Sequence, residues 1–136
     1  MQPKLLLRIA AAIMLLHTIG HTFGALTWED APNARVADII TGMRREHFIF
    51  MGRSASLADF YNGYGISMIF VLLLVSMQLW ILSTNPIKIT LIAIGFFLLA
   101  LAVCEYIYFF PMAALFSLLA SICVWLTWLK PSKGIA

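Results

Sequence analysis

The fold is decided first by residues 5–26, whose sequence is LLLRIAAAIMLLHTIGHTFGAL. A helix needs about 20 apolar residues to cross a bilayer core of about 30 Å, and this run is long enough. His17 and His21 interrupt it, and because residues four apart share a helix face, both imidazoles lie on one face. Gly20 and Gly24 have the same spacing. Imidazoles are costly in hydrocarbon, so this face of the helix indicates a polar function.

The composition of the whole chain agrees with a membrane protein. Of its 136 residues, 62 % are hydrophobic and 11 % are charged. A soluble domain is usually about half apolar and about a quarter charged. We therefore expect residues 1–136 to form a single integral membrane domain that has the lipid bilayer as its partner. The net charge of +3 comes from scattered bases, which argues against nucleic acid as a partner.

Three further apolar runs predict membrane helices at residues 64–82, 87–110 and 112–129. A short polar turn, residues 83–86, separates the first two of these. Pro111 marks a tight corner before the last, because proline suits the first turn of a helix and disfavours helix just before it. Short connections imply antiparallel neighbours. The predicted fold class is all-α, a four-helix transmembrane bundle.

Residues 27–63 form the one long connection, which we expect to cap the outer end of the bundle. Apolar residues at helical spacing predict a helix over residues 34–51, so that the loop is partly helical. Residues 52–56 are expected to end this helix. Ser56 or Asp59 is expected to cap the next one.

The orientation follows from the Lys and Arg residues near the helix ends. One side would carry Lys4, Arg8, Lys88, Lys130 and Lys133, whereas the arginines of the other side lie in the middle of the long connection. Basic residues favour the cytoplasm when they lie close to the spans. The sequence thus predicts a multi-pass protein of the bacterial inner membrane with both termini cytoplasmic.

Polar residues converge at one depth of the predicted bundle. Glu105 is the only acidic residue within a predicted span, and its depth, counted from the outer end of its helix, is similar to that of His21. The predicted second helix starts at the same face, preceded by polar residues at its entrance. The candidate binding residues are His17, Asp59, Tyr61, Asn62 and Tyr64.

The leading hypothesis is a polar pocket in the outer half of the bundle that binds a small hydrophobic molecule or a lipid. His21 and Glu105 would be the proton-handling pair, and the only candidates for catalytic residues. Proton transfer on a hydrophobic substrate suits these groups better than nucleophilic catalysis, since no nucleophile motif is present. The sequence does not decide whether the protein is an enzyme.

Two alternatives stay open. His17, His21 and Glu105 could together hold a divalent transition metal in a redox-associated subunit, because histidines at i and i+4 can reach one ion. A b-type haem fits less well, since two histidines of one helix cannot ligate both faces of the ring. The other alternative is a scaffold in which these residues only join helices. The Gly20 and Gly24 stripe predicts close approach of a neighbour within the bundle, or of a second copy in a homo-oligomer.

Two motifs carry a resemblance. Residues 17–24, HTIGHTFG, with Trp28 behind them, and residues 52–65, which include DFYNGYG, resemble a family of small, uncharacterised bacterial four-helix membrane proteins. The likeness covers the first half of the chain, and it implies a fold and a compartment without an activity. A weaker similarity to DoxX-like membrane proteins rests on helix number and size.

Overall fold

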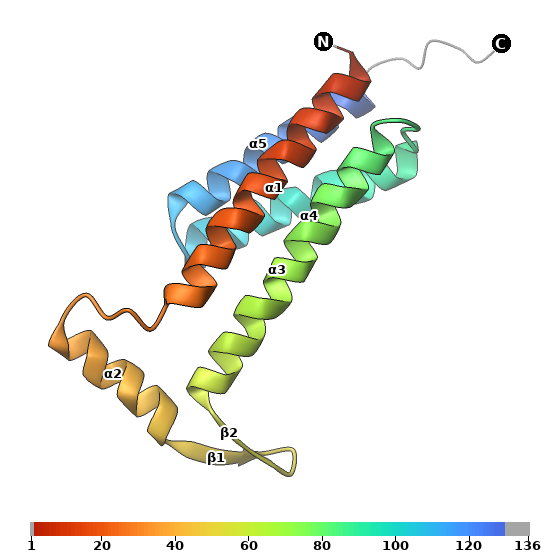
Figure 1. Cartoon of the computed structure of the whole chain (residues 1–136). Coiled ribbons are helices and arrows are strands. Elements are labelled where there is room, and N and C mark those ends of the chain that lie inside the picture. The colour runs from red at the N-terminus through yellow and green to blue at the C-terminus, as the bar shows by residue number, and fades with distance from the viewer. Residues whose placement is uncertain (1, 130–136) are drawn as a thin grey trace. The chain divides into compact units, whose positions relative to one another are not determined.

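The structure is a computed structural model, and it describes residues 2–129. It contains five helices and one pair of strands (Figure 1): α1 (Pro3–Thr27), α2 (Ala34–Arg45), β1 (His47–Phe50), β2 (Arg53–Ser56), α3 (Leu57–Leu82), α4 (Lys88–Tyr108) and α5 (Pro111–Trp128). Four of these helices, α1, α3, α4 and α5, are long and apolar enough to cross a membrane. The predicted all-α fold with four membrane helices is confirmed. The protein is a small multi-pass membrane protein.

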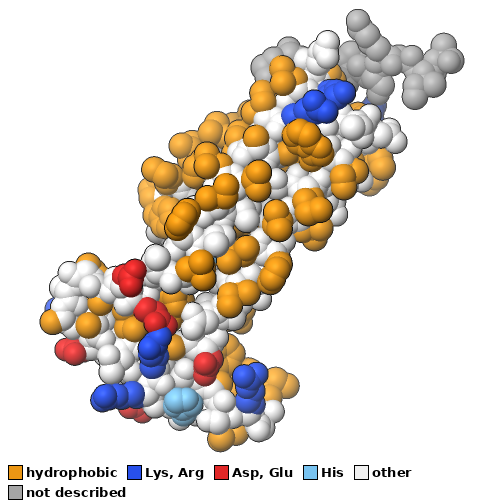
Figure 2. Space-filling model, viewed as in Figure 1, with side chains coloured by type: hydrophobic (Ala, Val, Ile, Leu, Met, Phe, Trp, Pro, Cys, Tyr) orange, Lys and Arg blue, Asp and Glu red, His pale blue; other side chains and the backbone are white. Residues whose placement is uncertain are grey.

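The described chain divides into two compact units. The bundle unit comprises residues 2–18 and 72–129, and the hairpin unit comprises residues 19–71. Helices α1 and α3 therefore each contribute one part to each unit. On the face that Figure 2 shows, apolar side chains cover the membrane-length helices, and most charged side chains gather around α2 and the two strands.

The bundle unit packs parts of all four membrane helices around a common core. Its fully buried side chains come from every one of these helices and include Leu7, Met14, Leu72, Leu79, Leu91, Leu98 and Val124. Helices α4 and α5 run antiparallel, joined by a two-residue connection that ends at Pro111 (Figure 1). Only 22–39 % of the most apolar part of each helix is buried, so most of its surface is left to lipid.

Small residues set the contacts within the bundle unit. The Ser76 hydroxyl donates to the Ala11 carbonyl at 2.8 Å, and the Ser121 hydroxyl donates to the Gly95 carbonyl at 3.0 Å. A Cβ atom at Gly95 would lie 2.9 Å from the Trp125 ring. Gly95 is therefore required by the close approach of α4 and α5.

The Gly20 and Gly24 stripe, in contrast, shows no such approach. A Cβ atom built at either position would meet nothing within 4 Å. The prediction that these glycines bring a helix of the same chain close is wrong for the described residues. In the hairpin unit the close contact occurs at Gly65, where a Cβ atom would lie 3.3 Å from the Ala25 Cβ.

The predicted helix over residues 34–51 is correct only as far as Arg45. Residues 47–50 instead pair with residues 53–56 in an antiparallel hairpin, with Phe50 opposite Arg53. Met51 and Gly52 have φ values of 50° and 82°, as two-residue hairpin turns require. Phe48 and Phe50 lie on the same face of β1, and both rings contact Phe60, at centroid distances of 5.9 and 5.3 Å. This period-2 contact explains why a strand forms here.

Helix α3 begins at Leu57, seven residues before the predicted start at residue 64. The Asp59 Oδ2 atom accepts hydrogen bonds from the Ser56 backbone N–H and hydroxyl, and the Ser56 hydroxyl accepts one from the Asp59 N–H. This reciprocal cap confirms the expected capping role of these two residues. The early start of α3 also shortens the capping loop predicted over residues 27–63, because residues 57–63 are helical. The other ends of the membrane helices lie within two residues of the predicted ones.

Candidate functional site

The bundle unit contains a buried pair of ionisable side chains. His17 lies on α1 and Glu105 on α4, and their side chains meet with 3.4 Å between Nε2 and Oε1. Both residues are almost inaccessible, with exposed fractions of 5 % and 6 %. The first and third membrane helices, α1 and α4, were predicted to meet at a polar site. This contact is present, and His17 is the residue that contacts Glu105.

Helix α5 completes the surroundings of the imidazole. The Ser117 hydroxyl lies 3.4 Å from His17 Nδ1, and the Phe116 ring stacks on the imidazole with a centroid distance of 5.7 Å. Both ring nitrogens of His17 thus have a polar neighbour, and the ring plane is held by an aromatic face. We call His17, Glu105 and Ser117 the histidine cluster.

Sequence reasoning missed Ser117, although a signal was present. Ser117 and Ser121 are four residues apart in an otherwise apolar helix, and both are fully buried. Residues at i and i+4 share a helix face. Their spacing identifies the face of α5 that packs inward.

The second carboxylate oxygen of Glu105 is the unusual atom of the cluster. Oε2 is buried and has no hydrogen-bond partner among the described residues. Burial of a polar atom without a partner is costly in an apolar environment, and nearly all such atoms are paired in native structures. Glu105 Oε2 is therefore a position where a proton, a water molecule or a polar ligand atom would be stabilised.

The remaining predicted residues belong to the hairpin unit. His21 Nε2 lies 3.0 Å from the Gly65 carbonyl oxygen, and since a carbonyl only accepts, Nε2 is the donor. The Trp28 indole N–H donates to Asn62 Oδ1 at 2.6 Å, and the Tyr61 ring lies 4.5 Å from the Trp28 ring. The predicted catalytic residue His21 and the predicted binding residues Tyr61 and Asn62 thus join the end of α1, and the residue that follows it, to the first turns of α3.

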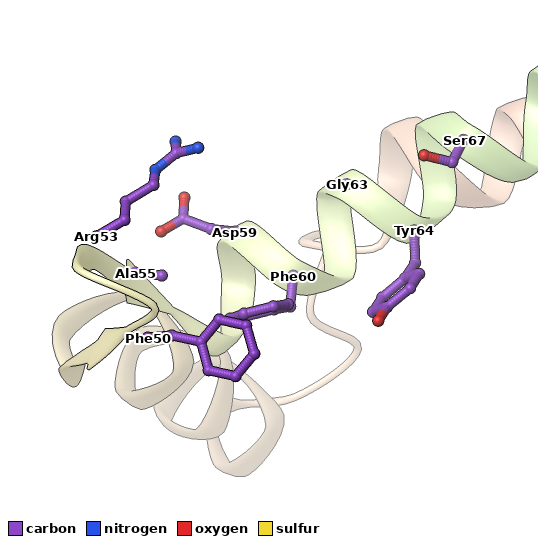
Figure 3. A pocket seen from close by; sticks show the side chains of 8 residues that line it. All are labelled: Phe50, Arg53, Ala55, Asp59, Phe60, Gly63, Tyr64 and Ser67. Atoms are coloured by element: carbon purple, nitrogen blue, oxygen red, sulfur yellow. The ribbon is translucent and has the colours of Figure 1, made fainter.

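Asp59 and Tyr64 line a pocket of about 390 Å³ in the hairpin unit. Its lining also includes Arg53 and Ala55 from β2, Phe50 from β1, and Phe60, Gly63 and Ser67 from α3 (Figure 3). In Figure 3 the charged groups of Arg53 and Asp59 lie on one side of the pocket, and the rings of Phe50 and Phe60 lie on the other. We call this the hairpin pocket.

The structure gives the metal hypothesis no support. Within residues 2–129, no three His, Cys, Asp or Glu side chains lie close enough together to hold a metal ion. The two cysteines, Cys104 and Cys123, are free thiols.

Comparisons with protein-family models, with curated proteins and with solved structures find no match to this chain. The family resemblance expected from the sequence motifs stays a prediction. The class of protein accordingly rests on the four membrane-length helices and on the buried cluster between them.

Proposed function

We propose that the protein binds a small hydrophobic molecule or a lipid at the histidine cluster, and that His17 and Glu105 exchange a proton with the bound molecule. The observation that carries the proposal is the buried, unpartnered Oε2 atom of Glu105 beside the imidazole. His17 takes the part that the sequence suggested for His21.

The chemistry of the cluster indicates the class of ligand that it would bind. One carboxylate oxygen without a partner matches one hydroxyl or carbonyl group, because a carboxyl group accepts when ionised and donates when protonated. The Phe116 ring adds an apolar surface, because it stacks on the imidazole of His17. A mostly apolar molecule with a single polar head is therefore the class of ligand that this site suits.

A hydrophobic carbodiimide tests the proposal directly, since it enters apolar sites and reacts with protonated carboxyl groups there. We expect dicyclohexylcarbodiimide to modify Glu105 in the purified full chain, as located by mass spectrometry of peptides. The Glu105→Gln variant should show no label at this position. A water-soluble carbodiimide should instead prefer exposed carboxyl groups such as those of Asp30 and Asp38.

The alternative scaffold role makes the opposite prediction. A cluster that only joins helices is packed and leaves no room for a reagent. If Glu105 stays unmodified in folded protein, the proposed binding site is wrong and the scaffold is favoured. This alternative has its own support, because the His17 ring is already in contact with both α4 and α5.

We further propose that residues 1–136 form a single integral domain of a bacterial inner membrane, with both ends of the chain in the cytoplasm. Four spans return the chain to the side from which it started. Lys4 and Arg8 precede or begin the first span and Lys88 begins the third, which supports a cytoplasmic location for these ends. Lys130 and Lys133, which the sequence also places on this side, lie outside the described residues.

A further inference from the structure

The hairpin pocket carries one positive and one negative side chain and is therefore neutral overall. Its cation is Arg53 and its anion is Asp59. Among the described residues no ion pair joins them, although both lie on the same side of the pocket (Figure 3). A ligand that contains one anionic and one cationic group would match this arrangement, whereas a simple anion would also meet the carboxylate.

The position of Asp59 is fixed by the cap of α3. Both hydrogen bonds from Ser56, at 2.8 and 2.9 Å, go to Oδ2. The other oxygen, Oδ1, remains for a ligand. Arg53 presents a planar guanidinium group, which binds phosphate through two parallel hydrogen bonds.

The apolar part of the pocket and its surroundings point to a membrane lipid. The pocket contains the rings of Phe50, Phe60 and Tyr64, and its volume is in the range of about 300–1,000 Å³ that ligand sites occupy. At the turn of the hairpin, Ile49 and Met51 are 75 % and 92 % exposed. Large apolar side chains presented in this way are typical of segments that lie in the membrane interface.

The length of α3 places the pocket at the depth of the headgroups. Its 26 residues extend about 39 Å at 1.5 Å per residue, which exceeds the roughly 30 Å of the hydrocarbon core. Asp59, Phe60 and Tyr64 lie in the first turns of the helix. These turns are the polar end of α3, and therefore the end that extends into the interfacial layer.

From these observations we infer that the hairpin pocket binds the headgroup of a zwitterionic phospholipid with a primary amine. Arg53 holds the phosphate, Asp59 Oδ1 accepts from the ammonium group, and the aromatic rings contact the glycerol and the first part of an acyl chain. This site uses no residue of the histidine cluster, so it is independent of the proposed function.

Native mass spectrometry of the detergent-purified full chain tests this inference with three lipids of matched acyl chains. We expect phosphatidylethanolamine to bind at least about tenfold more tightly than phosphatidylglycerol, which lacks the amine, or phosphatidylcholine, whose amine cannot donate. Arg53→Gln and Asp59→Asn should each weaken phosphatidylethanolamine binding about tenfold. The side-chain oxygen of Asn can still accept from the Ser56 N–H and hydroxyl, as Asp59 Oδ2 does, so Asp59→Asn keeps the start of α3 intact.

Matched controls are available on α2. Arg35→Gln and Asp38→Asn remove the same charges from exposed positions outside the pocket, and both should leave phosphatidylethanolamine binding unchanged. Stronger binding of phosphatidylglycerol, or equal losses in the controls, would overturn the inference. So would equal displacement of the lipid by inorganic phosphate and by phosphoethanolamine, because the pocket would then be a plain anion site.

Discussion

At the scale of single residues, the pair of His17 and Glu105 is expected to couple two helices energetically. Interhelical hydrogen bonds in membrane proteins average about 0.6 kcal/mol and reach about 1.7 kcal/mol. We predict a coupling energy of about 1 kcal/mol between His17→Ala and Glu105→Gln, since the two side chains contact each other directly.

The measurement is a double-mutant cycle on the free energy of unfolding, with the protein titrated from mild detergent into sodium dodecyl sulfate. Ser121→Ala combined with Glu105→Gln serves as the control cycle, because Ser121 bonds to the Gly95 carbonyl and not to this pair. Additive effects of His17→Ala and Glu105→Gln, within about 0.3 kcal/mol, would contradict the predicted coupling.

Two glycines in helices are predicted to respond to the same substitution in opposite ways. Gly95→Ala should destabilise the protein by about 1–3 kcal/mol, because the new Cβ would lie 2.9 Å from the Trp125 ring. Gly20→Ala should have no cost or stabilise by up to about 1 kcal/mol, since nothing lies within 4 Å and alanine favours helix. The free energy of unfolding of both variants, measured by titration from mild detergent into sodium dodecyl sulfate, tests this prediction. Equal destabilisation would show that Gly20 also contacts a neighbour, such as a second copy.

The depth of Glu105 could be predicted from the sequence, whereas the histidine that contacts it could not. Counting from helix ends placed Glu105 at the depth of His21, one turn from His17, because the rise per residue is constant. That count does not fix which of two histidines on the same helix face contacts it. The choice depends on side-chain packing with α5, where Ser117 and Phe116 surround the ring of His17. The pairing of His21 and Glu105 as a proton-handling site stays a prediction.

At the scale of elements, the hairpin depends on its two turn residues. Gly52 has a φ of 82°, a conformation that side chains with a Cβ rarely adopt. We predict that Gly52→Ala destabilises the hairpin by about 1 kcal/mol and raises hydrogen exchange at residues 47–56. Met51→Gly should have the opposite effect, because Met51 also has a positive φ. Exchange measured by mass spectrometry on peptides of the hairpin, with peptides of α4 as the internal reference, checks both variants.

The same hairpin is the element that sequence reasoning missed. The apolar run at residues 47–51 follows an amphipathic helix without a proline, and a Met-Gly turn lacks the Asn-Gly signature of short hairpins. The contacts that favour a strand are made with Phe60, ten residues beyond β1. The four membrane helices, in contrast, were predictable, because each is a long apolar run that satisfies its backbone hydrogen bonds internally.

At the scale of the whole molecule, the proposed orientation makes a prediction about labelling. A single cysteine introduced at Arg35, in α2, should be accessible from the periplasm if both ends of the chain are cytoplasmic, because one span separates α2 from the amino end. A cysteine at Asn85, between α3 and α4, should be accessible only from the cytoplasm. A membrane-impermeant maleimide applied to intact cells and to inverted vesicles measures this, in a background where Cys104 and Cys123 are replaced by Ser. Labelling in the reverse pattern would contradict the cytoplasmic ends.

The two strands of the hairpin limit how deeply this end of α3 can enter the membrane. Among residues 2–129 each strand has one partner only, so the N–H and C=O groups along its outer edge require water or lipid headgroups. The apolar turn favours entry into the bilayer, and the bare strand edges oppose it. These two requirements are both met at one level, the boundary between headgroups and hydrocarbon. The hairpin would therefore fix the start of α3 at this boundary even when the thickness of the bilayer changes.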